Sequence, residues 1–169
     1  DRFKVVVVNL GPSDAEIFFV RSETGAEEEL ELQGVAQGGG GSLDMENRKL
    51  GDEGATLLSG LEILSQVTTL ILGDNGISDK GISALCDSPY LSQVKVLNLK
   101  SNKISAEGAK LLAQSPNWSN LDQLILKFNE IGEEGAKHLA NSEVLSNIST
   151  LDLFRNHIGP EGAKAIRSS

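Results

Sequence analysis

The sequence has 169 residues, a formal net charge of −9 at pH 7 and only 4% aromatic residues. The acidic balance argues against general binding to nucleic acid or to anionic membranes, because both need clustered basic side chains. Hydrophobic residues make up 39% of the chain, so we expect one globular domain, or one domain with an appendage, around an aliphatic core.

Residues 1–37 contain three strand-like runs with turn residues between them. The runs are Phe3–Leu10, which is rich in valine, Ile17–Arg21, and Glu28–Val35, which alternates acidic and apolar residues. The intervening Gly-Pro-Ser-Asp and Ser-Glu-Thr-Gly segments favour turns. We therefore predict a small antiparallel β segment over residues 1–37. Residues 38–42, Gly-Gly-Gly-Gly-Ser, have the composition of a flexible linker, natural or engineered.

From residue 43 to residue 169 the sequence repeats with a period of 27 residues and no insertion. The five repeats start at Leu43, Leu70, Leu97, Leu124 and Leu151. The recurring pattern is Leu-x-Leu-x-x-Asn-x-Ile, where x is any residue, followed by a Gly-Ala or Gly-Ile pair. Trp118 occupies a recurring leucine position, so we expect it in the core. A fixed period in the range of about 20 to 50 residues is typical of a repeat architecture.

Each repeat is predicted to contain a strand, a turn, a helix and a loop. The alternating Leu-x-Leu segment is typical of a short strand with one buried face. Serine and glycine are suitable residues at a helix start, so we expect the helices to begin near Gly51, Ser78, Ser105, Gly132 and Gly159. The glycine inside each helix implies close approach of the neighbouring repeat. Stacked repeats then share one core that none could bury alone.

An asparagine recurs five residues after the start of every repeat but the first. The set is Asn75, Asn102, Asn129 and Asn156, and the first repeat has Arg48 instead. A buried side-chain amide can satisfy backbone groups where a strand bends into its turn. We therefore interpret the four residues as a structural asparagine ladder, in preference to ligand contacts, and expect a more exposed or irregular turn around Arg48.

With these motifs, residues 43–169 resemble the ribonuclease-inhibitor-like class of leucine-rich repeats. That class includes the repeat regions of nucleotide-binding innate-immune receptors and the Ran GTPase-activating proteins. The resemblance implies an α/β fold, a right-handed solenoid or horseshoe with a parallel sheet on the concave face and helices on the convex face. Here the antiparallel β segment precedes it. The resemblance also implies a protein ligand, held on the concave face or its edges.

Both ends of the predicted solenoid leave alternatives open. The first repeat lacks two leading apolar positions, which are Gln37 and Gly40 here. Residues 1–37 either cover that open end, as a solenoid cap would, or belong to another domain. The sequence stops at Ser169 inside the fifth predicted helix. Either that helix is itself the cap or the chain is truncated.

No catalytic or metal-binding arrangement stands out in the sequence. The two histidines, His138 and His157, share no metal-ligand spacing, and the glycine run lacks the Lys-Ser/Thr end of a phosphate-binding loop. We therefore expect no enzyme activity, no metal and no cofactor. Cys86 is the single cysteine, which excludes an intrachain disulfide and favours a cytoplasmic location, although a bacterial origin would also explain it.

The alternation of strand side chains identifies the residues expected on the concave face. The first two repeats contribute acidic residues, Asp44, Glu46 and Asp74. The later repeats contribute the predicted binding residues Lys100, Ile125, Lys127, Phe128, Phe154 and Arg155. Arginine and aromatic residues are enriched in binding hot spots, which favours a ligand site there. The alternative is that the two phenylalanines only pack on each other along the sheet.

We predict a protein–protein interaction module that binds an unidentified protein ligand through its concave face, without nucleic acid or membrane contact. One alternative is a regulator that activates a small GTPase. Another is a structural or oligomerising repeat segment of a larger receptor or effector, with exposed solenoid ends that stack into a homodimer.

Overall fold

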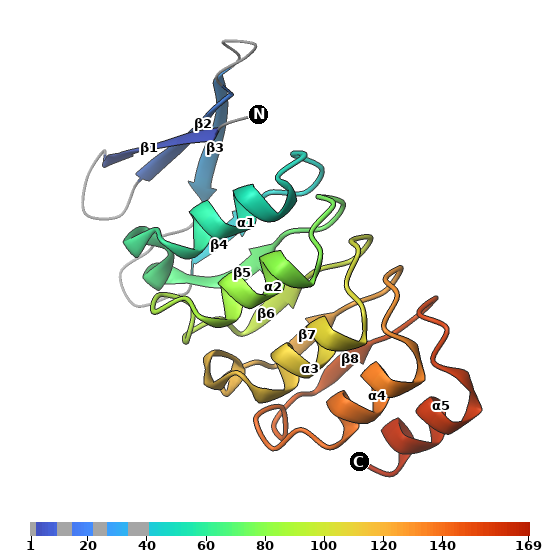
Figure 1. The fold of residues 1–169 in the computed structure, drawn as a ribbon. Helices are drawn as coiled ribbons and strands as arrows, with labels where there is room; N and C mark the ends of the chain where they lie inside the picture. Colours follow the sequence, from blue (N-terminus) through green and yellow to red (C-terminus); the bar gives the residue numbers. More distant parts are fainter. Residues whose placement is uncertain (1–2, 10–14, 22–26, 34–40) are drawn as a thin grey trace.

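The computed structural model describes residues 3–9, 15–21, 27–33 and 41–169. Their eight strands form one sheet in chain order, β1 to β8, and the helices lie on one face of its C-terminal part (Figure 1). Residues 38–40 of the predicted linker lie outside the described residues, whereas Gly41 and Ser42 belong to a strand. Of the helices that the structure describes, none has the length and apolar character needed to cross a membrane.

The N-terminal strands form the predicted antiparallel β segment. They are β1 (Phe3–Asn9), β2 (Ala15–Arg21) and β3 (Glu27–Gln33). Strand β2 pairs antiparallel with both β1 and β3. Strand β3 then pairs antiparallel with β4 (Gly41–Asp44), where Leu32 lies opposite Leu43. The sheet therefore continues without a break from the N-terminal strands into the first repeat.

The five repeat strands are parallel, as predicted. They are β4, β5 (Val67–Ile71), β6 (Val96–Asn98), β7 (Gln123–Ile125) and β8 (Thr150–Asp152). The five predicted start leucines lie opposite one another in register, from Leu43 to Leu151. A repeat of constant length is what makes this register possible, because each repeat returns the chain to the same level of the sheet.

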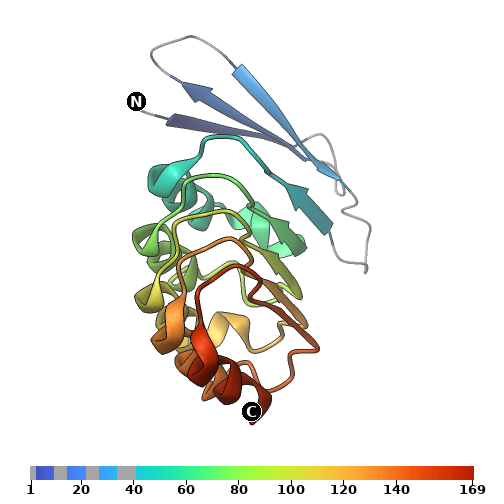
Figure 2. The same cartoon turned by 90° about the vertical axis from the view of Figure 1, so that its right-hand side faces the viewer.

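One α-helix follows each repeat strand, and together the helices form the convex face of the solenoid (Figure 2). They are α1 (Gly51–Ser59), α2 (Asp79–Cys86), α3 (Ala106–Gln114), α4 (Gly132–Ala140) and α5 (Gly159–Arg167). Two short 3-10 helices, η1 (Glu62–Gln66) and η2 (Pro116–Trp118), lie in the loops that lead back to the sheet. The fold is therefore an α/β leucine-rich-repeat solenoid of right-handed horseshoe type.

The core lies between the sheet and the helices. Both leucines of the Leu-x-Leu segments are fully buried in the third and fourth repeats, and Trp118 is fully buried as predicted. Full burial of such a side chain contributes about 1.5 to 3 kcal/mol of transfer free energy. In the fifth repeat, Leu151 and Leu153 are only partly buried. The same positions are fully buried in the first two repeats as well, so the core is closed from the first to the fourth repeat and only the last repeat is partly open.

The recurring helix glycines lie where neighbouring repeats touch, as the sequence predicted. A Cβ atom on Gly135 would lie 2.5 Å from the Ile131 side chain and 3.1 Å from the Ala106 backbone in the preceding helix. The backbone cannot move aside as a flexible side chain would. Only glycine therefore allows the helices to pack this closely.

The helices start at or next to the predicted residues, and α2 and α3 are capped by a side chain of the preceding repeat. Asp52 of α1 accepts the Ser78 N–H at 2.8 Å, the Ser78 hydroxyl at 2.6 Å and the Gly81 N–H at 3.0 Å. Asp79 does the same for Ser105, accepting its N–H at 2.8 Å and its hydroxyl. Each aspartate therefore caps the next helix, which fixes one repeat on another.

Candidate functional site

The four ladder asparagines are buried and join each turn to the repeat before it. Their exposed fractions lie between 1% and 8%. Asn102 Nδ2 donates to the carbonyl groups of Leu72 and Leu99 at 3.1 and 3.0 Å. Its Oδ1 accepts the N–H groups of Asn75 and Ile77 at 3.1 and 3.0 Å. With these partners inside the protein, the amide groups are not available to a ligand.

Arg48, which stands at this position in the first repeat, is half-buried and therefore more exposed than the asparagines. Its backbone N–H donates to Asn75 Oδ1 at 2.9 Å. The turn of the first repeat is therefore stabilised by the second repeat, because Asn75 supplies the acceptor for the Arg48 N–H.

The structure separates Lys100 from the other predicted binding residues. Lys100 Nζ forms an ion pair with Glu46 Oε1 at 2.6 Å, two repeats away. The side chain reaches that far because it lies across Gly73, where a Cβ atom would be 2.9 Å from Lys100 Cγ. Lys100 therefore points to the acidic residues of the first two repeats.

Phe128 and Phe154 form an exposed aromatic pair on the last two repeats. Their exposed fractions are 47% and 59%, and no other large hydrophobic side chain of residues 41–169 is as exposed. The ring centroids lie 5.7 Å apart with the rings at 84°, an edge-to-face contact. The Arg155 guanidinium lies 5.5 Å from the centroid of the Phe154 ring, within the range of a cation–π contact.

Lys127 lies next to Phe154 along the sheet direction. The Phe128 N–H donates to the Phe154 carbonyl at 2.9 Å, which holds the two chain segments in register. Neighbouring strands lie about 4.8 Å apart, so the Cα atoms of Lys127 and Phe154, which occupy the same position in consecutive repeats, are close together. We call Lys127, Phe128, Phe154 and Arg155 the aromatic cluster. Ile125, one alternation earlier on β7, is half-buried beside it.

Two members of the aromatic cluster have a left-handed backbone. Phe128 has φ +59° and Arg155 has φ +58°, and the equivalent residues Asn47, Asp74 and Ser101 have φ between +54° and +56°. The turn demands this conformation in every repeat, and small polar residues tolerate it best. Bulky side chains there cost about 1 to 3 kcal/mol. These residues are exposed, so no burial in the core offsets the cost of their backbone strain.

Two aspartates of the repeat strands, one beside the aromatic cluster and one in the first repeat, accept hydrogen bonds from the backbone two residues later. Asp152 Oδ1 accepts the Phe154 N–H at 3.0 Å, and Asp44 Oδ1 accepts the Glu46 N–H at the same distance. Asp152 therefore helps to shape the chain under Phe154.

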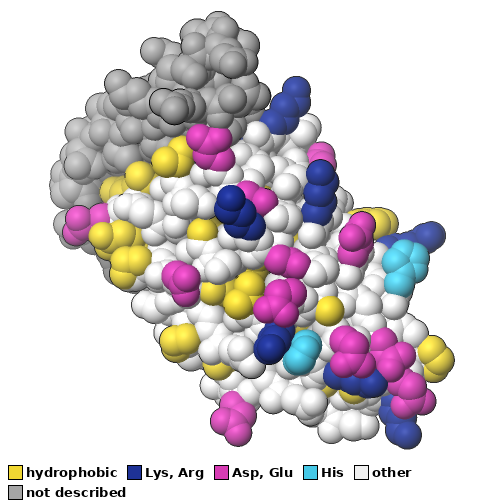
Figure 3. Space-filling view, viewed as in Figure 1, with side chains coloured by type: hydrophobic (Ala, Val, Ile, Leu, Met, Phe, Trp, Pro, Cys, Tyr) yellow, Lys and Arg dark blue, Asp and Glu magenta, His cyan; other side chains and the backbone are white. Residues whose placement is uncertain are grey.

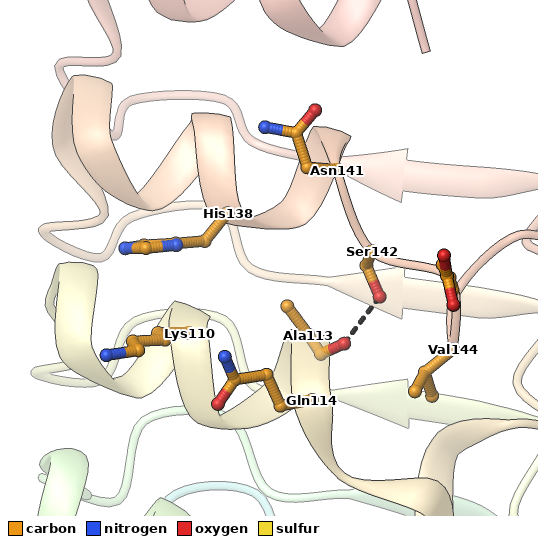
Figure 4. A pocket seen from close by; sticks show the side chains of 8 residues that line it. Lys110, Ala113, Gln114, His138, Asn141, Ser142 and Val144 are labelled. Atoms are coloured by element: carbon orange, nitrogen blue, oxygen red, sulfur yellow. Dashed lines mark hydrogen bonds between the residues drawn. The ribbon is translucent and has the colours of Figure 1, made fainter.

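The convex face carries mixed charges in place of an exposed aromatic pair. Figure 3 shows acidic and basic side chains interspersed over the helices. A pocket of about 320 Å³ lies between α3 and α4, a site that the sequence analysis missed (Figure 4). Its polar lining includes Lys110, Gln114, His138 and Glu143, and the Ser142 hydroxyl donates to the Ala113 carbonyl at 2.6 Å. One sequence signal was visible: Val144 stands where Asn117 stands one repeat earlier.

Cys86 is half-buried and receives a hydrogen bond from Trp118 Nε1–H, 3.3 Å from its Sγ. Burial raises the pKa of the Cys86 thiol, so the thiolate is disfavoured. Among the residues that the structure describes, no group of three or more histidine, cysteine, aspartate or glutamate side chains is arranged to hold a metal ion.

Comparison with known proteins assigns the family. The model of the Leucine Rich repeat family matches residues 66–86, 92–113, 119–140 and 144–166, just over half of the chain. No curated protein matches the chain. Among solved structures, an internalin (inlF) from Listeria monocytogenes str. 4b F2365 is similar, with 37% identity and a TM-score of 0.49. The match covers 64% of this chain, which spans only 28% of that internalin. The chain belongs to the leucine-rich-repeat family.

Proposed function

We propose that the chain is a protein-interaction module whose ligand contacts the concave face around Phe154. The observation that carries the proposal is the exposed aromatic pair, Phe128 and Phe154, because every other large apolar side chain of residues 41–169 is buried or partly buried. Lys127, Ile125 and Arg155 complete the proposed contact surface. Lys100, bound to Glu46, forms its border. Exposed apolar residues beside arginine are typical of interaction sites.

Site-directed photocrosslinking tests this proposal directly. A photoreactive phenylalanine analogue replaces Phe154 in one variant and the exposed Glu107 of α3 in a control variant. We expect a protein from the source organism's lysate to crosslink at position 154 and not at position 107. Competition with the unlabelled chain removes that product, whereas a Phe128→Ala/Phe154→Ala competitor does not. Equal labelling at both positions, or equal competition, refutes a concave-face site.

We also propose the ribonuclease-inhibitor-like class for these repeats. The 27-residue period and a convex α-helix of eight or nine residues in every repeat support this assignment. Activation of a small GTPase stays a prediction from the family resemblance, to be tested by GTP hydrolysis with and without the chain. The cytoplasmic location also stays a prediction, as do the absence of nucleic acid and membrane partners.

A homodimer is a second candidate, in which the chain oligomerises through a solenoid end. The observation that favours it is the partial exposure of Leu151, Leu153 and Ile166, whose equivalents in the third repeat, such as Leu97 and Leu99, are fully buried. Light scattering over a wide concentration range tests the idea. A dimer that an Ile166→Lys variant loses supports it, and a monomer at every concentration refutes it.

A further inference from the structure

We propose that the aromatic cluster binds an acidic protein segment in which a carboxylate lies next to an aromatic or branched apolar side chain. This inference rests on the proposed function, because it names the chemistry of the ligand at the same surface.

The first argument is that the two cations of the cluster lack acidic partners. Lys100 forms an ion pair with Glu46, but Lys127 and Arg155 have no carboxylate within ion-pair distance among the described residues. The Arg155 guanidinium only lies over the Phe154 ring. A guanidinium that stacks on an aromatic face keeps its N–H donors free at its edge. A carboxylate is the group that matches this edge with two hydrogen bonds.

The second argument is that nearby acidic side chains are poorly placed to fill this role. Asp152 directs one carboxylate oxygen to the Phe154 N–H. Glu130 is exposed two residues after Phe128, and it makes no ion pair with either cation of the cluster. The acidic residues of the first two repeats, Asp44, Glu46 and Asp74, lie between two and four strands away. Screening limits their effect, since charges beyond about 8 Å interact weakly at physiological salt.

The third argument concerns the apolar part of the ligand. The edge-to-face pair of Phe128 and Phe154 forms a corner in which each ring keeps about half of its surface exposed, 47% and 59%. A third aromatic or branched aliphatic side chain adds to such a corner with favourable ring geometry. The left-handed turn holds Phe128 in one backbone conformation, so little ordering remains for binding.

A second copy of the chain fits the cluster less well than an independent acidic segment. Face-to-face association of two clusters would bring Lys127 and Arg155 of each copy together, which like-charge repulsion opposes. A nucleic acid would supply phosphates to the same cations, but it would meet a protein of net charge −9. The chemistry therefore favours a protein segment with isolated carboxylates.

Selection from a random dodecapeptide library tests the inference without a known ligand. The library is selected on the intact chain, and enriched peptides are synthesised with a fluorophore for anisotropy titration. We expect enriched sequences to carry Asp or Glu within two residues of an aromatic, Leu or Ile side chain. We expect Arg155→Ala to weaken their binding at least about ten-fold, Arg155→Lys to weaken it less, and the control Lys80→Ala, on α2, to leave it unchanged.

The outcomes separate this inference from the proposed function. Peptides that lose affinity in Phe154→Ala but carry no enriched acid, or that bind Arg155→Ala unchanged, overturn the acidic-ligand inference and leave the concave-face module standing. Failure to enrich any peptide that depends on Phe154 overturns both. Circular dichroism of each variant establishes that it is folded. Dimerisation of the chain that Arg155→Ala abolishes and that the peptides reverse would assign the cluster to self-association and also overturn the inference.

Discussion

Replacing Asn102 by leucine tests whether the asparagine ladder holds the repeats together. Leucine has a similar size but removes the amide, so the N–H groups of Asn75 and Ile77 lose their acceptor inside the protein. An unsatisfied buried donor costs about 1 to 3 kcal/mol. Two such donors, offset in part by the added apolar surface, give an expected loss of about 3 kcal/mol in the free energy of unfolding. That is a large part of the stability of a small domain.

Asn156→Leu is the matched control for this prediction. Asn156 is buried on the same ladder, but its Oδ1 accepts only the Ile131 N–H, at 3.2 Å. One N–H group without its acceptor predicts a loss of about 1 to 2 kcal/mol in the free energy of unfolding. Urea denaturation followed by circular dichroism gives both values from the midpoints and slopes. If the two variants lose the same stability within about 0.5 kcal/mol, the count of orphaned N–H groups does not determine the ladder's contribution.

A helix cap, a left-handed turn and the buried thiol each give a further prediction. Asp52→Ala should lower the free energy of unfolding by about 1 to 2 kcal/mol, because α2 loses its cap, whereas Glu53→Ala beside it should change little in the same urea titration. Phe128→Asn should be more stable than Phe128→Ala by about 1 kcal/mol in thermal unfolding, because both remove the ring and only asparagine favours the left-handed turn. Equal melting temperatures would remove the argument for strain. The Cys86 thiol should react with a disulfide reagent more slowly than an unfolded-chain cysteine, and the gap should persist as the pH approaches 9.0, the ordinary pKa, because burial raises the pKa of the thiol. A reaction as fast as that of the denatured chain would contradict the burial of this thiol.

Periodicity was enough to predict the parallel register, because apolar positions that recur at a constant interval must stack. The start leucines from Leu43 to Leu151 illustrate this, since they lie opposite one another as the repeat alignment requires. Trp118 also followed its position in the repeat, because a recurring core position accepts a larger side chain if its neighbours adapt.

Contacts that cross repeats could not be predicted in the same way. The alternation of strand residues put Lys100 on the concave face, but only the structure shows that Gly73 leaves room for it to reach Glu46. The backbone strain at Phe128 was not predicted either. Asn47 and Asp74 occupy the same turn position in earlier repeats, and these small polar residues were the one sequence signal of a left-handed conformation there. The alternation therefore predicted that Lys100 points away from the core, whereas its ion-pair partner could not be predicted from the sequence.

The helix caps restrict how the repeat array can grow by duplication. Asp52 and Asp79 each serve a serine in the next repeat, whereas Ala106 precedes a repeat whose helix begins with Gly132, at φ +68°. A copied unit must therefore offer its successor the cap that its own helix start requires. The second repeat meets this condition, because Ser78 and Asp79 stand side by side and a tandem copy would pair correctly with itself. A copy of the third repeat would leave its new Ser105 facing Ala106, without an acceptor. Growth of this protein by gene duplication is thus constrained at two adjacent residues in each unit.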